Sequence, residues 1–159
     1  MASNYLNILA DIKARFDAIS DIGIVHDYER LTKNWQEFLA LFAYTPDGGN
    51  QQIRGWEITR RSVPEHKRGA YYRHHVFIVR GYLSLKDSDA TDKTFQILVD
   101  TICETFRAVG EVSTWYYRDG ENPENSPCQV DLIEPRMFGG VLCHYCEITL
   151  YVTEWIVPT

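Results

Sequence analysis

Apolar residues recur at intervals of three and four in two long stretches of the chain, and this spacing is typical of helices that bury one face. The first stretch covers 4–19, and the second runs from about residue 91 to Val109, where Gly110 provides a natural stop. The side chains able to cap these helices are, in chain order, Ser3, Asn4, Asp89 and Thr91. We therefore predict two long amphipathic helices.

A third, shorter helix is expected over 34–43. Asn34 followed by Glu37 fits a capping box, in which each residue satisfies a free amide at the start of the helix. Apolar side chains again recur on one helical face. The turn-forming sequence PDGGN at 46–50 predicts a loop after this helix.

The remaining stretches alternate apolar and polar positions, as half-buried strands do. The expected strands cover 22–28, 52–61, 71–85, 128–136 and 141–156. Polar loops are expected at 62–70 and 118–127, and Pro135 is expected to end an edge strand. The order of elements predicts one α+β domain of 159 residues, with helices packed on a mainly antiparallel sheet.

The last strand contains a C-x-x-C motif, Cys143 and Cys146, with His144 inside it. On a strand, residues three apart point to opposite faces, so the two thiols cannot hold one metal ion or close one disulfide. No second pair of metal-ligand spacing accompanies them. We interpret the motif as part of an ordinary strand, and the four cysteines as free thiols in a reducing compartment.

The net charge of −6 is unevenly distributed. Residues 51–80 carry 7 basic and 2 acidic side chains, whereas residues 81–159 carry 5 basic and 13 acidic ones. Such a layout suits contact with further copies of the chain, or a limited basic surface for nucleic acid. The candidate contact residues around the expected 62–70 loop are Arg60, Arg61, Lys67, Arg68 and Arg73. A solvated hairpin end is the simpler alternative.

Signatures of catalysis and of cofactor binding are missing from the sequence. His74 and His75 are neighbours on an expected strand and so face opposite sides, one toward the core or an interface and one toward solvent. There is no phosphate-binding loop, nucleophile elbow or complete calcium loop. We expect no enzyme activity and no cofactor, although a cysteine–histidine site formed in space stays open. No apolar run reaches the roughly 20 residues that span a bilayer, so no membrane partner is expected.

Three segments together resemble a known family. They are IRGWEITRR, the stretch HHVFIVRGYLSLKDSDATDKTFQILVDTICETFRAV, and VDLIEPRMFGGVLCHYCEITLYVTEW. A strand of the type H-x-F-x-x-x-G-Y, an acidic turn, an amphipathic helix and a closing strand of the type C-x-I-x-L-x-V-x-E follow one another over roughly 50–156. This order is similar to that of tail terminator and neck (tail-completion) proteins of long-tailed bacteriophages.

The resemblance implies a virion protein, assembled in the host cytoplasm, that forms a homo-oligomeric ring, typically a hexamer. Such a ring caps the tail tube, ends its polymerisation and meets the head–tail connector, while genomic DNA passes through the lumen without sequence-specific binding. The family brings no catalytic residues. A head-completion or connector protein of the same neck is the nearest alternative, and a small nucleic-acid-binding module using Tyr71 and Tyr72 for stacking is a third.

Overall fold

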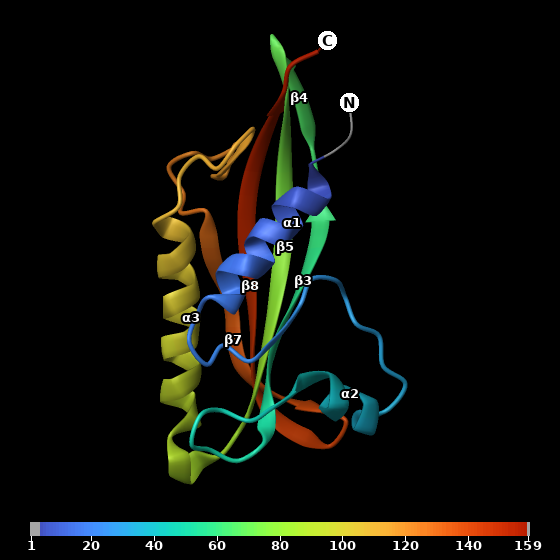
Figure 1. Ribbon diagram of the computed structural model, residues 1–159, viewed down its shortest axis with the longest axis vertical. Helices are drawn as coiled ribbons and strands as arrows, with labels where there is room; N and C mark the ends of the chain where they lie inside the picture. The colour runs from blue at the N-terminus through green and yellow to red at the C-terminus, as the bar shows by residue number, and fades with distance from the viewer. Residues whose placement is uncertain (1–3, 159) are drawn as a thin grey trace.

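The computed structural model describes residues 4–158, which form helices around one curled sheet (Figure 1). The helices are α1 (Tyr5–Asp17), α2 (Trp35–Phe42), the 3₁₀ turn η1 (Asp87–Asp89) and α3 (Thr91–Arg107). The strands are β1 (Ile24–His26), β2 (Ala43–Tyr44), β3 (Gln52–Ser62), β4 (Glu65–Arg68), β5 (Ala70–Ser84), β6 (Trp115–Tyr117), β7 (Cys128–Phe138) and β8 (Val141–Ile156). The predicted α+β class is confirmed.

Strands β5 and β8 form the middle of the sheet and pair antiparallel from Tyr71↔Ile156 to Ser84↔Cys143. On one side β5 pairs with β3 and β4, and β3 in turn pairs with β1 and β2. On the other side β8 pairs with β6 near its end and with β7 along the rest. The pairing of β1 with β3 is parallel and the other pairings are antiparallel, so the sheet is mainly antiparallel as expected.

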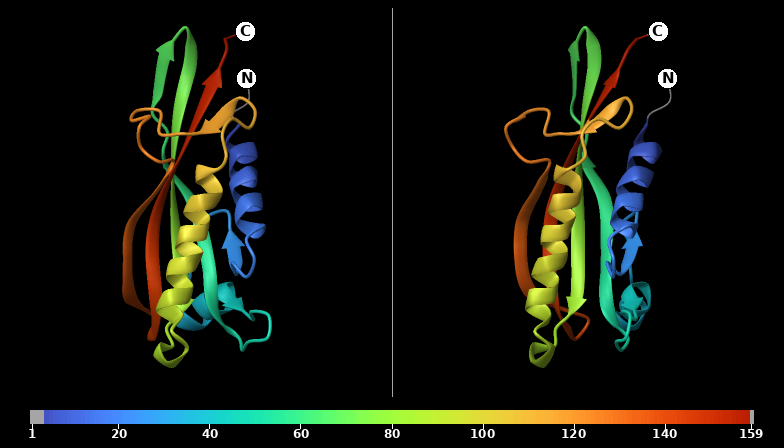
Figure 2. Two further views of the ribbon diagram at one scale, coloured as in Figure 1. Left: turned by 90° about the vertical axis from the view of Figure 1, so that its left-hand side faces the viewer. Right: turned by 60° about the vertical axis from the view of Figure 1, so that its left-hand side comes forward.

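Helices cover the two faces of the sheet unequally. The helices α1 and α3 lie side by side on one face and enclose the main core (Figure 2). Its fully buried aromatic residues include Phe16, Trp56, Phe77 and Phe106. The short helix α2 covers a smaller cluster on the opposite face, around Tyr82. The helices α1 and α3 bury their apolar stripes, which are the periodicity that predicted them, whereas α2 buries Phe42 and leaves Trp35 exposed.

The C-x-x-C prediction can now be compared with the strand that carries it. Cys146 lies in the main core and Cys143 in the cluster beneath α2, on opposite faces of β8. Both thiols are buried and free. Burial raises the pKa of the Cys143 thiol to about 11. The interpretation of this motif as ordinary strand is therefore confirmed.

Several boundary predictions were wrong. Residues 65–68, expected in a polar loop, form β4, because they continue the ladder along β5 after a bulge between Arg60 and Ser62. The strand β6 was not predicted at all. Pro135 does not end β7, which continues to Phe138, because an edge strand needs no amide on its outer side.

The predicted helix caps also differ in detail. The Asn34 side chain accepts a hydrogen bond from the Glu37 amide at 3.0 Å, as predicted. The Glu37 carboxylate, however, accepts from the amide of Lys33. For α3, the N-cap is Ala90 in a left-handed conformation, and neither Asp89 nor Thr91 caps the helix. The Thr91 hydroxyl instead accepts a hydrogen bond from the Lys86 amide and donates one to the Lys86 carbonyl oxygen. Asn4 is the N-cap of α1 but makes no side-chain capping bond; its side-chain amide instead donates to the Thr114 hydroxyl at 2.8 Å, and Ser3 lies outside the described residues.

Candidate functional site

A hairpin formed by β4 and β5 extends beyond the ends of α1 and α3, together with the end of β8 (Figure 2). Its turn is Gly69, with a φ of +77° that favours glycine. Because the helices do not reach this end of the sheet, side chains of the hairpin are largely open to solvent. The structure thus confirms a hairpin with a basic tip, although its arms are longer than predicted.

The five candidate basic residues divide into two groups. Arg61, Lys67 and Arg68 are exposed, the first near the end of β3 and the other two on β4. The Arg60 guanidinium instead lies 4.2 Å from the centroid of the Tyr5 ring, against α1. Arg73 places its Nε 3.4 Å from Glu65 Oε1. The first three therefore form the available basic surface, and Arg60 and Arg73 are engaged within the subunit.

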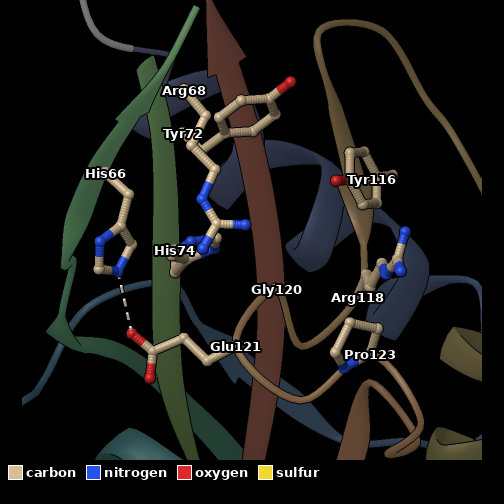
Figure 3. Close-up of a pocket in the computed structure, with 9 residues that line it drawn as sticks. All are labelled: His66, Arg68, Tyr72, His74, Tyr116, Arg118, Gly120, Glu121 and Pro123. Atoms are coloured by element: carbon tan, nitrogen blue, oxygen red, sulfur yellow. Dashed lines mark hydrogen bonds and ion pairs between the residues drawn. The ribbon is translucent and has the colours of Figure 1, made fainter. Parts of the chain in front are cut away.

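A pocket of about 620 Å³ lies between this hairpin and the segment formed by β6 and the loop after it (Figure 3). The hairpin contributes two histidines, one arginine and one tyrosine, and the later segment contributes another tyrosine, another arginine and one carboxylate. These residues are His66, Arg68, Tyr72, His74, Tyr116, Arg118 and Glu121. Glu121 already has a partner, since its Oε1 lies 3.4 Å from His66 Nε2. The pocket therefore offers two guanidinium groups beside two phenol rings, and the Arg118 guanidinium lies 5.8 Å from the centroid of the Tyr116 ring.

The loop that closes the pocket is stabilised by hydrogen bonds between the Asp119 side chain and backbone amides of the same loop. Asp119 is buried and accepts the amides of Glu121 and Asn122, each at 3.1 Å. Gly120 passes so close to the sheet that a Cβ there would lie 2.1 Å from His74 Nδ1. Burial, followed by the neighbouring His66, lowers the pKa of His74. A neutral His74 is thus favoured beneath this loop.

The opposite edge of the sheet carries negative charge. Within residues 4–158, β7 pairs only with β8, so its outer edge is unpaired. Along this edge and the loop before it stand Glu124, Asp131 and Glu134. Asp131 accepts the hydroxyl of Thr149, and Glu134 receives Arg136 Nε at 2.5 Å. The sheet therefore carries basic side chains at its β4 edge and mainly acidic ones at its β7 edge, and these two strands lie on opposite sides of the central pair β5–β8 (Figure 1).

His75 and His74 face opposite sides, as predicted, but the buried one has a partner that the sequence did not reveal. His75 is fully buried, and its Nε2 lies 2.8 Å from Oε2 of the equally buried Glu154. Burial lowers the pKa of His75, although the carboxylate opposes this shift. Arg60 and Arg73 add positive charge nearby and act in the same direction as burial.

Other candidate chemistry finds no assembled site in the described part of the chain. Residues 4–158 contain no group of three or more histidine, cysteine or acidic side chains able to hold a metal ion. His144 lies against α3 and exchanges a hydrogen bond with Thr91 at 2.8 Å. No helix among these residues is long and apolar enough to cross a membrane.

The pocket was missed by sequence reasoning because its walls are far apart along the chain. His66 and Glu121 are separated by 55 positions, and no local pattern links them. The Asp119–Gly120 pair signals a turn, but a turn alone does not say where the loop folds. Compared with known families and with curated proteins, the chain matches no family and no curated sequence.

Proposed function

We propose that this chain is a structural subunit of a long-tailed phage, a tail terminator or neck protein that assembles into a homo-oligomeric ring, as the family it resembles does, typically as a hexamer. The ring would cap the tail tube, end its polymerisation and join it to the head connector. The observation that carries the proposal is the opposite charge of the two open edges of one sheet. The sequence resemblance supplies the biological setting.

Edge strands are the natural sites for association between sheets, because their outer backbone groups are free to pair. In this chain one edge presents Arg61, Lys67 and Arg68, and the other presents Glu124 together with Glu134, which forms an exposed pair with Arg136. Two copies can therefore meet basic edge to acidic edge. Such a contact uses a different surface on each partner, and it closes into a ring when the rotation between subunits allows.

Opposite charges at an interface chiefly set register, exclude wrong pairings and speed encounter. The exposed hairpin can reach a neighbouring copy without any movement of the core. A net charge of −6 also suits a ring around DNA, because a strongly basic lumen would hold phosphates back. These features support self-assembly with the DNA as a passing partner.

The decisive experiment uses two matched charge reversals. Lys67→Glu/Arg68→Glu makes both edges acidic, and Glu124→Lys/Glu134→Lys makes both edges basic. We expect each variant alone to be monomeric by native mass spectrometry, under conditions in which the wild type forms a ring. Mixed in equal amounts, the two variants should restore an alternating ring with an even number of subunits.

Restoration in the mixture is the informative result, because misfolding of either variant cannot produce it. Rings formed by each variant alone would contradict the proposed edges, and so would a wild-type protein that stays monomeric. Lys13→Glu, on α1 and away from both edges, serves as a control for the reversal of a single surface charge. Binding of the ring to purified tail tube rather than to head connector would separate the terminator from the connector alternative.

A second candidate function, binding of single-stranded nucleic acid, is favoured by the pocket itself. Its two arginines can contact phosphates and Tyr72 and Tyr116 can stack on bases. This reading predicts that a labelled oligonucleotide binds the isolated subunit and dissociates steeply with rising salt. Arg68→Glu and Arg118→Glu should each weaken that binding, whereas the edge proposal requires no oligonucleotide binding at all.

A further inference from the structure

Two cysteines from separate elements touch beneath α3. Cys103 lies on the buried side of that helix, and Cys128 is the first residue of β7. Their sulfur atoms are 3.5 Å apart, and the Cys128 thiol donates to Cys103. A disulfide requires an S–S distance of about 2.05 Å, so the atoms need to approach by only about 1.5 Å. The proposed assembly makes no use of this pair.

The two thiols differ in their readiness to ionise. The hydrogen bond from Cys128, with a smaller contribution from Arg107, lowers the pKa of Cys103. The same hydrogen bond and burial raise the pKa of Cys128. Cys143 and Cys146 have raised pKa values because of burial. The site therefore pairs one thiolate-forming cysteine with one protonated neighbour in contact with it.

We propose that Cys103 and Cys128 form a peroxide-sensitive dithiol that closes to an intramolecular disulfide. The two residues are 7% and 5% exposed, which suits a small hydroperoxide as the oxidant rather than a bulky disulfide. The Cys103 thiolate attacks one peroxide oxygen. An S–O bond forms, the O–O bond breaks and hydroxide leaves, so that sulfur is oxidised to sulfenic acid and peroxide is reduced.

The second step uses the neighbouring thiol. Cys128 attacks the sulfenic sulfur, the S–S bond forms and the S–O bond breaks. The proton of Cys128 leaves with the departing hydroxide as water, so the two steps together consume one peroxide and two thiols. The product ties α3 to the start of β7 and closes the segment that contains β6 and the pocket loop.

Trypsin separates the cysteines in a way that makes the product easy to identify. Cleavage after Lys93, Arg107, Arg118 and Arg136 places Cys103 in peptide 94–107 and Cys128 in peptide 119–136. The other two cysteines remain together in peptide 137–159. The folded, full-length protein is treated with hydrogen peroxide, free thiols are blocked with N-ethylmaleimide, and the digest is measured by mass spectrometry without reductant.

We expect a cross-linked species of peptides 94–107 and 119–136, two hydrogens lighter than their sum and lost on treatment with dithiothreitol. The oxidised protein should melt about 5–10 °C higher than the reduced one. Cys146→Ser should keep the cross-link, and Cys103→Ser should abolish both effects. Blocked but unlinked Cys103 and Cys128, a link to peptide 137–159 instead, or an unchanged melting temperature of the linked protein would each overturn the proposal.

Discussion

The buried pair of His75 and Glu154 offers a sharp test of how this sheet is held together. Both side chains are fully buried, and Nε2 of the imidazole donates to the carboxylate at 2.8 Å. The imidazole also stacks on Phe77, with the ring planes 12° apart. His75→Phe would keep a ring in this stack and remove the donor. Glu154 Oε1 already has no hydrogen-bond partner, so the carboxylate would be left without this bond.

Breaking a buried pair by removing one partner costs about 3–5 kcal/mol, because the remaining charge stays desolvated. A domain of this kind is stable by only about 5–15 kcal/mol, so the single substitution should remove about a fifth or more of the total. Replacing both partners by apolar residues is close to neutral in comparable cases. His75→Phe/Glu154→Met should therefore recover stability to within about 1 kcal/mol of the wild type.

Urea unfolding at pH 7, followed by fluorescence of the four tryptophans and by circular dichroism, measures these differences. The control is Lys13→Ala, which breaks an exposed pair with Asp17 at 2.7 Å and should cost less than about 1 kcal/mol. A loss below about 1 kcal/mol in His75→Phe would refute the reasoning. A double variant as unstable as the single one would also refute it.

Three further changes test other parts of the fold. Burial lowers the pKa of His74, His75 and His144 from 6.5, so the unfolded chain binds these protons at a higher pH than the folded protein does. The free energy of unfolding should therefore have its full value above pH 6.5 and fall below it, by less than about 1.4 kcal/mol per pH unit per histidine. Urea titrations at several pH values measure this fall. Asn34→Ala removes the cap of α2 and should cost about 1 kcal/mol by the same assay. Gly81→Ala places a Cβ 2.2 Å from a buried indole ring and should lower thermal stability by about 1–3 kcal/mol, with altered near-ultraviolet circular dichroism.

The predicted helices were the most accurate part of the sequence reasoning. The 3.6-residue repeat in α1 and α3 reflects contact with a single apolar face, and such a repeat is visible without knowing what lies opposite. The last strand was likewise predicted with its observed bounds, Val141–Ile156. Its alternating pattern also places Cys143 and Cys146 on opposite faces, which excludes a joint site of the two thiols from the sequence alone.

Short strands escaped detection because they depend on partners. The sequence EHKR at 65–68 carries no apolar alternation, and it forms β4 because β5 lies alongside. The strand β6 is three residues long and pairs with the end of β8. In each case a distant segment supplies the hydrogen bonds, so local propensity is too weak a guide.

The amino-acid sequence shows which segments are amphipathic, and with them the α+β class, the basic hairpin and the acidic second half. Which charged groups come into contact depends on the tertiary structure. In the folded protein the Arg60 guanidinium lies over the Tyr5 ring, His75 pairs with the buried Glu154, and Glu121 lies beside His66. The reason is physical: periodicity reports the environment of one face of one element, whereas a pocket or an ion pair is a distance between elements, which only the packed sheet sets.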